Sequence, residues 1–111
     1  MAYSKYRAKK TVVDGITFDS KKEADFYCEL KMLRMGGVVK DFERQHKFLL
    51  QEAFRHHGKA ERAVTYIADF VVEYADGRVE VIDVKGVRTD VYKLKRKLLL
   101  YRHPEMIFRE V

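Results

Sequence analysis

Two strand patterns joined by a short turn constrain the fold of this 111-residue chain more than any other feature. Residues 65–74 and 78–85 are rich in β-branched and aromatic residues, and a turn at 75–77 that contains Asp-Gly separates them. Such residues favour strands and Asp-Gly favours a tight turn, so we expect an antiparallel hairpin. Each strand interrupts its apolar run with an acid, Asp69 in the first and Asp83 in the second.

The length of the turn decides whether the two acids meet. A two-residue turn places Asp69 opposite Val84 and sends its side chain to the other face of the sheet. A three-residue turn with Gly77 in the left-handed conformation places Asp69 opposite Asp83, with Cβ atoms about 5 Å apart. Lys85 follows Asp83 by two residues, so in a continuous strand both side chains leave the same face.

Two carboxylates so close together need a counter-charge. At about 4 Å they repel by about 4 kcal/mol at an effective dielectric constant near 20. A shared proton or Lys85 could neutralise the pair. A hard divalent cation would neutralise it and add chemistry, because Mg²⁺ binds few carboxylates and retains several waters.

The first part of the chain predicts a hairpin and a helix. Residues 12–18 alternate around Asp14-Gly15, and Ser20 with Glu23 forms a capping-box signature that begins a helix ending at Gly36-Gly37. The helix has an apolar stripe of four residues, Phe26, Tyr27, Leu30 and Leu33. Glu23 lies one step back along this stripe and therefore points toward the core, where it either completes the cap or serves a site.

The remaining elements follow from periodicity. We expect a strand at 38–50, a polar loop at 51–63, a helix at 90–102 and a last strand at 106–111. The second helix is expected to face the core with Val91, Leu94, Leu98 and Tyr101. The order α-β-β-β-α-β after an N-terminal hairpin predicts an α/β fold, a central mixed sheet flanked by two helices, in a single domain of residues 1–111 with a basic arm at 1–11.

The charge of the chain favours a polyanionic partner. The formal net charge is +6 and the isoelectric point is near 9.4. Basic residues cluster in the N-terminal arm, in the polar loop and on the second helix, and nucleic acid is the commonest partner of such clusters. Any single cation is better explained by a solvated surface, and only the clustering of the cations favours nucleic acid. The candidate DNA contacts are Lys9, Lys10, Arg55, Lys59, Arg62, Lys93, Arg96 and Lys97.

Several classes of protein are excluded or disfavoured. A single cysteine, Cys28, excludes a disulfide within the chain and favours a reducing compartment. No apolar stretch is long enough to span a membrane and no signal peptide is recognisable, so we expect a cytoplasmic protein. No phosphate-binding glycine loop is present, which argues against a nucleotide cofactor. The adjacent His56 and His57 lack a third ligand at metal-binding spacing.

The element order with Asp69, followed fourteen residues later by Asp83-Val84-Lys85, resembles the PD-(D/E)XK nuclease superfamily. Ala68 stands where the superfamily usually has proline, and Asp83 stands where it more often has glutamate. Residues 14–24, 66–70 and 83–86 further resemble a group of small phage and prophage proteins similar to junction resolvases. This second resemblance extends from about Lys5 to Leu99.

The resemblance implies that Asp69, Asp83 and Glu23 bind Mg²⁺ or Mn²⁺ and that Lys85 completes the catalytic set. It implies a metal-dependent endodeoxyribonuclease of phage origin that hydrolyses phosphodiester bonds in branched or Holliday-junction DNA, as a homodimer in the cytoplasm of a bacterial host. Two alternatives stay open, a nicking or repair nuclease without junction preference and a DNA-binding accessory protein without catalysis.

Overall fold

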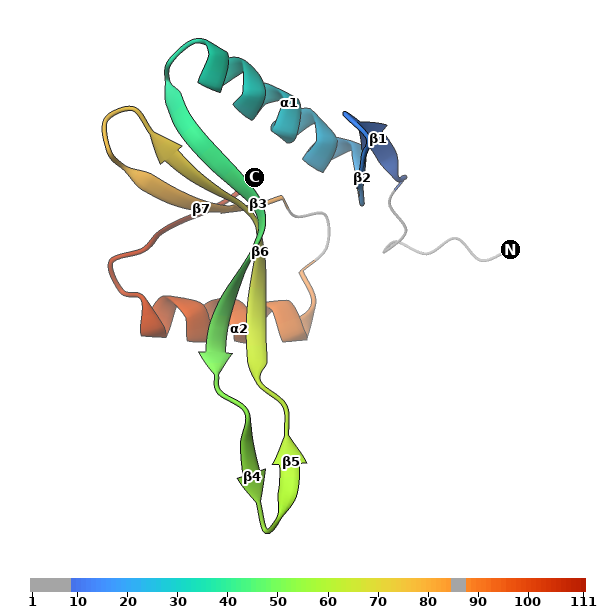
Figure 1. Cartoon of the computed structure of the whole chain (residues 1–111), viewed down its shortest axis with the longest axis vertical. Helices are drawn as coiled ribbons and strands as arrows, with labels where there is room; N and C mark the ends of the chain where they lie inside the picture. The colour runs from blue at the N-terminus through green and yellow to red at the C-terminus, as the bar shows by residue number, and fades with distance from the viewer. Residues whose placement is uncertain (1–8, 85–87) are drawn as a thin grey trace.

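A computed structural model describes residues 9–84 and 88–111 of the chain and has an α/β architecture. A four-stranded sheet in the order β3-β6-β7-β8 lies between two helices (Figure 1). β3, β6 and β7 are antiparallel, and β8 runs parallel to β7, so the sheet is mixed as predicted. The elements of this core are α1 (Lys21–Met35), β3 (Val39–Gln51), β6 (Val64–Tyr74), β7 (Val79–Asp83), α2 (Asp90–Arg102) and β8 (Ile107–Glu110).

The N-terminal hairpin and the first helix have the predicted boundaries. β1 (Thr11–Val13) pairs with β2 (Ile16–Phe18) through Asp14 and Gly15, whose φ angles of 53° and 75° fit a two-residue turn of the primed type. Ser20 caps α1 by accepting a hydrogen bond from the Glu23 amide at 3.1 Å. Gly36 is the C-terminal cap.

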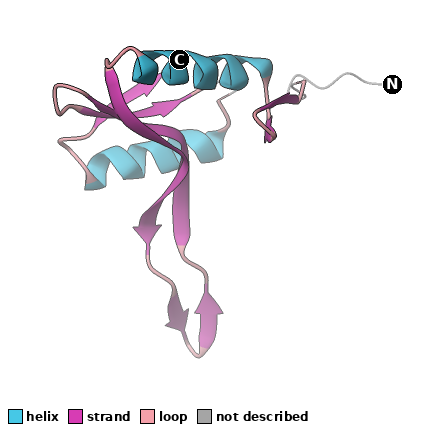
Figure 2. Cartoon of the chain, turned by 45° about the horizontal axis from the view of Figure 1, so that its top comes forward, coloured by secondary structure: helices cyan, strands magenta, loops and turns pink. Residues whose placement is uncertain are grey.

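Each face of the sheet carries its own hydrophobic core (Figure 2). The α1 core contains six large buried side chains, Phe18, Leu30, Val39, Phe70, Val72 and Ile82. The α2 core contains Leu50, Tyr66, Ala68, Val81 and Leu99. The predicted stripe of α1 packs on its core as expected, with Leu30 buried and Phe26, Tyr27 and Leu33 partly buried. Neither α1 nor α2, among the residues described, is long and apolar enough to cross a membrane.

The turn between β6 and β7 has the three-residue form that brings the two acids together. The Tyr74 amide donates to the Arg78 carbonyl oxygen at 2.8 Å, and Gly77 is left-handed with φ of 92°. Phe70 pairs with Ile82, so the next position of the ladder sets Asp69 against Asp83. β7 ends at Asp83, earlier than predicted, and Lys85 lies outside the described residues.

The prediction of a loop at 51–63 is wrong, because this segment forms a hairpin of its own. β4 (Phe54–His56) pairs with β5 (Lys59–Glu61) around His57 and Gly58, whose φ angles are 49° and 78°. All six strand residues are exposed, so the segment has none of the hydrophobic alternation that indicates a strand. The hairpin extends from the ends of β3 and β6 as an arm (Figure 1).

The predicted inner face of α2 is also wrong. Val91, Leu94, Leu98 and Tyr101 are 62%, 57%, 39% and 84% exposed. The helix instead packs on the sheet with a parallel stripe that includes Tyr92 and the fully buried Leu99. Arg96 lies on this inner side with its guanidinium over the ring of Phe108, so long side chains with polar tips cover the sheet where an aliphatic stripe was expected.

Candidate active site

The candidate site lies where β3 changes which of its alternating side chains point toward α1 and which point toward α2. Phe42 packs against the α1 core and Phe48 against the α2 core, although both positions have the same parity. In a regular strand, residues an even number apart share a face. The change occurs at Gln45, which has a left-handed φ of 53°. A residue with a β-carbon adopts this conformation at a cost of roughly 1 kcal/mol or more.

The side chains of β6 make the same change of side at Asp69, the residue opposite Gln45. Ala68 lies in the α2 core and Phe70 in the α1 core, again at equal parity. The ladder pairs Arg44 with Phe70 and His46 with Ala68, which leaves Gln45 and Asp69 facing each other. We call this place, where both strands change face at Gln45 and Asp69, the crossing, and the ribbons of β3 and β6 pass over each other in the view of Figure 1. The double change of face therefore places the side chain of Asp69 at the crossing.

Asp69 and Asp83 are tied to each other's strands by backbone amides. The Asp69 amide donates to Oδ1 of Asp83 at 3.0 Å, and the Val84 amide donates to Oδ2 of Asp69 at 2.8 Å. Asp83 is fully buried, whereas Asp69 is partly exposed. Hydrogen bonds from amides stabilise the ionised form of a carboxylate. The pair is thus fixed in position, with Asp69 on the solvent side.

Glu23 approaches the crossing from α1. Its side chain is 6% exposed, and Nε2 of Gln45 lies 3.5 Å from its Oε2. Its amide also donates to the cap at Ser20, so Glu23 belongs both to the helix start and to the surroundings of Gln45. The prediction that this acid points inward is confirmed.

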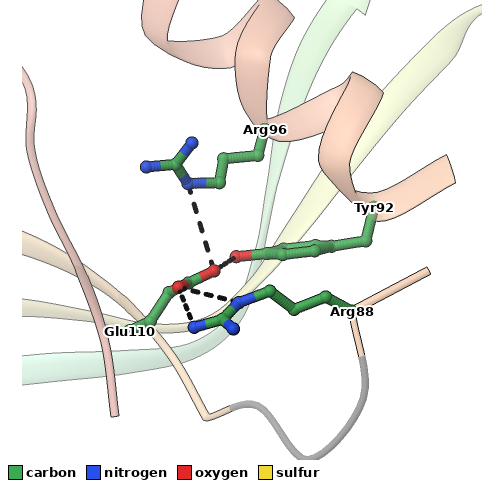
Figure 3. A network of polar contacts seen from close by, with 4 residues as sticks. All are labelled: Arg88, Tyr92, Arg96 and Glu110. Carbon is green, nitrogen blue, oxygen red and sulfur yellow. Dashed lines mark hydrogen bonds and ion pairs between the residues drawn. The ribbon is translucent and has the colours of Figure 1, made fainter. Parts of the chain in front are cut away.

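A second network of polar contacts, the acid network, joins Glu110 on the last strand to Arg88, Tyr92 and Arg96 (Figure 3). Glu110 pairs with Asp83 in the parallel ladder between β7 and β8. Arg88 donates to Oε1 of Glu110 from Nη2 at 2.7 Å and from Nε at 3.1 Å. The Tyr92 hydroxyl donates to Oε2, and Nε of Arg96 lies 4.0 Å from the same oxygen.

These contacts shift the pKa values of both Glu110 and Tyr92. Hydrogen bonds from Arg88 and then Tyr92 lower the pKa of Glu110 to about 2. Burial, followed by the hydrogen bond to Glu110 and the negative charge of Asp83, raises the pKa of Tyr92 well above its usual value. Tyr92 is therefore a neutral hydroxyl between two acids. Gln45, Asp69, Asp83 and Glu110 form one polar row across all four strands of the sheet.

The donor set suits a hard cation more than a soft one. Asp69 and Asp83 supply carboxylate oxygens, the ligands that Mg²⁺ and Mn²⁺ prefer. Over residues 9–84 and 88–111, no three His, Cys, Asp or Glu side chains gather closely enough to form a metal site by themselves. Two carboxylates still fit Mg²⁺, which keeps several waters in its coordination shell. His56 and His57 contact each other at the exposed tip of the β4–β5 arm, whereas the two acids lie on β6 and β7.

The predicted DNA contacts fall into three groups. Lys9 and Lys10 are exposed just before β1, and Lys10 lies 3.9 Å from Asp19. The arm exposes Arg55, Lys59 and Arg62, and α2 exposes Lys93 and Lys97. Arg96 differs from the others because its guanidinium is directed toward Glu110 and packs on Phe108, 5.3 Å from the ring centre. We therefore place Arg96 in the acid network instead of on a DNA-binding surface.

Three residues of this region were not predicted as functional. Gln45 lies at the centre of Glu43-Arg44-Gln45-His46-Lys47, five polar residues in succession within a strand, and this break in alternation is a usable signal. The side chains of Arg44 and His46 point away from the crossing, because Arg44 stacks on Phe18 and His46 packs against Phe48. Tyr92 and Glu110 gave no signal in the sequence, because their meeting depends on the pairing of β8 with β7.

Comparison with known proteins gives one match. No curated protein and no solved structure matches the chain. One family model, described as a protein of unknown function (DUF1064), matches residues 3–111. Because this match covers nearly all of the 111 residues, the chain belongs to the DUF1064 family.

Proposed function

We propose that this protein is a metal-dependent endodeoxyribonuclease that hydrolyses phosphodiester bonds in DNA. The observation that carries the proposal is the cross-strand pair Asp69 and Asp83, held by reciprocal backbone amides at the crossing of β3 and β6. A core position filled by a fully buried acid beside a second acid lowers folding stability unless something compensates. A bound cation both compensates this charge and gives the pair a task.

Asp69 and Asp83 would hold the cation, with Glu23 and Gln45 at its border. When bound, Mg²⁺ or Mn²⁺ lowers the pKa of a coordinated water and neutralises charge on a phosphoryl oxygen. The chain supplies the geometry. The two amide bonds fix the carboxylates on their strands, and the contact of Gln45 with Glu23 joins α1 to β3. Through the resemblance to the PD-(D/E)XK superfamily, we assign Lys85 the task of orienting the attacking water or stabilising the developing charge.

The exposed cations offset the repulsion between an acidic site and a phosphate backbone. Lys93 and Lys97 lie on α2, the helix that also contributes Tyr92 to the neighbourhood of Asp83. A two-stranded ribbon such as the β4–β5 arm matches the width of the DNA major groove, and its basic side chains suit phosphates. A substrate that reaches both the arm and the crossing is large, which favours branched DNA over a short single strand.

A DNA-binding protein without catalysis is the second candidate. One observation favours it: Asp83 is fully buried and accepts a backbone amide, as a purely structural acid would. The two candidates differ in a single measurable outcome, the cleavage of DNA in the presence of a divalent cation.

The test compares the wild type with Asp83→Asn and Asp69→Asn on four DNA forms. The substrates are a four-way junction, a nicked duplex, a linear duplex and a single strand, each with Mg²⁺, Mn²⁺ or EDTA. We expect cleavage that requires the metal and falls by on the order of 10²-fold or more in either variant, while binding stays equal or tightens because a negative charge near phosphate is lost.

Asp76→Asn is the matched control. It makes the same change of charge in the same hairpin, at the exposed turn where Asp76 accepts the Arg78 amide at 2.9 Å. Asparagine is well tolerated in such turns, so this variant should cleave as the wild type does. Binding without cleavage under every metal favours the accessory protein. Equal cleavage of every DNA form favours a nicking or repair nuclease without junction preference.

A further inference from the structure

The outer face of α2 carries an apolar stripe that nothing in the described part of the chain covers. Val91, Leu94, Leu98 and Tyr101 are exposed, and Tyr101 is the most exposed of them at 84%. We propose that this stripe binds a second copy of the chain, with α2 packed antiparallel against the partner's α2 about a two-fold axis. The proposal concerns assembly and does not depend on nuclease activity.

The spacing of the stripe is self-complementary. The four residues are separated by three, four and three positions, as the a and d positions of a heptad are. A two-fold axis makes the same patch of each copy meet itself. In an antiparallel pair centred between Leu94 and Leu98, Leu94 faces the partner's Leu98 and Val91 faces the partner's Tyr101.

A pocket beside Val91 fits the most exposed side chain. It has a volume of about 270 Å³, and its lining includes Tyr66, Ile67, Val91 and Lys95. The Tyr66 hydroxyl is buried and has no hydrogen-bond partner among the described residues. A tyrosine ring with a polar tip suits a pocket whose lining mixes the apolar Ile67 and Val91 with polar groups such as those of Thr65, Thr89 and Lys95. The partner's Tyr101 thus fills the pocket and acts as the anchor of the interface.

Area and charge indicate a modest affinity. The stripe together with the half-exposed Ile67 offers roughly 500 Å² of surface on each chain, against about 800 Å² for each partner in a standard interface. Asp90 at the start of α2 faces the partner's Arg102 at its end, which favours the antiparallel direction. Lys95 faces the partner's Lys97 near the axis, where the charged heads of these long side chains extend to solvent. Apolar contact therefore drives the pairing, with a dissociation constant of micromolar order.

Sedimentation velocity without DNA or metal tests the pairing between about 5 and about 300 µM. We expect the wild type to approach twice the chain mass of 13.2 kDa, and Leu98→Glu to remain at that mass with an unchanged far-UV circular dichroism spectrum. The matched control is Met35→Glu, which places the same charge at an 88% exposed apolar residue on α1. A monomeric wild type, or a Leu98→Glu variant that dimerises like it, overturns the proposal.

Cysteine cross-linking tests the direction of the helices. In a Cys28→Ser background, Val91→Cys combined with Tyr101→Cys should give a disulfide-linked dimer under mild oxidation. Val91→Cys alone should stay monomeric on a non-reducing gel, because the two Val91 positions lie at opposite ends of an antiparallel pair. Efficient cross-linking of Val91→Cys alone indicates parallel helices and overturns the antiparallel arrangement.

Discussion

Replacement of Glu110 by glutamine should remove a measurable part of the pH dependence of folding stability. The pKa of Glu110 is lowered from 4.5 to about 2 by its hydrogen bonds with Arg88 and Tyr92. A carboxyl with a lowered pKa stabilises the folded state above its unfolded value, and this stability is lost as the pH falls through 4.5 toward 2. The full shift corresponds to about 3 kcal/mol. Because the Arg88 side chain is 57% exposed, solvent screening reduces the expected contribution to about 1–2 kcal/mol.

The assay is urea unfolding of the wild type and Glu110→Gln at a series of pH values between 7 and 2.5. Tyrosine fluorescence and far-UV circular dichroism are suitable probes, since the chain has seven tyrosines and no tryptophan. The wild type should be more stable by about 1–2 kcal/mol above pH 5, and the two curves should converge toward pH 2. Glu105→Gln, at an exposed acid two residues before β8, serves as the control and should run parallel to the wild type. Parallel curves for Glu110→Gln and the wild type would refute the proposed role of the network.

Three further variants probe the crossing and the DNA surface. Gln45→Gly should raise the free energy of unfolding by up to about 1 kcal/mol in urea titrations, because glycine adopts the left-handed backbone without strain. Gln45→Ala should not raise it, and a stabilised alanine variant would contradict the strain at this position. Both variants should reduce cleavage if the contact of Gln45 with Glu23 matters. Lys93→Ala with Lys97→Ala should flatten the plot of log binding constant against log salt by roughly 0.9 for each lost phosphate contact, and an unchanged slope would remove α2 from the DNA surface.

The meeting of Asp69 and Asp83 was predictable as one of two outcomes, because one local choice, the length of the turn, fixes it. Once the turn at residues 75–77 has three residues, the period of two along each strand sets every later pair. A left-handed Gly77 suits both turn lengths, so the sequence left that choice open, and in the structure Gly77 but not Asp76 is left-handed, as the three-residue form requires. The start and end of α1 were predictable for the same kind of reason, since capping depends on residues three positions apart.

The inner face of α2 was not predictable from periodicity. Two stripes of equal spacing run along this helix, one aliphatic and one mixed, and hydrophobicity favours the aliphatic one. The mixed stripe is buried because Glu110 on β8 receives Tyr92 and attracts Arg96, partners that are distant in sequence. The aliphatic stripe then remains outside, which is understandable if a second chain covers it.

The arm and the crossing escaped prediction for opposite reasons. The arm has no buried residue, so no hydrophobic pattern marks its strands, although His57-Gly58 is a turn signal that could have been read. The crossing depends on Gln45 adopting a conformation that its residue type disfavours. A local preference that the tertiary structure overrides is invisible to any argument from propensity.

The crossing is a better candidate for the functional site than the mainly apolar pocket at the edge of the α2 core. That pocket has a volume of about 400 Å³ and is lined by His46, Phe48, Val81 and other mainly apolar residues. Such a lining is explained by incomplete packing at the edge of a hydrophobic core. The crossing instead combines a strained Gln45, a buried Glu23 and a fully buried Asp83 in contact with Asp69. Each of these features lowers stability, and a sequence selected for folding alone would replace them with glycine and aliphatic residues. Their concentration at one point of the sheet is best explained by a task performed there, and we propose that this task is the binding of a cation beside a phosphate.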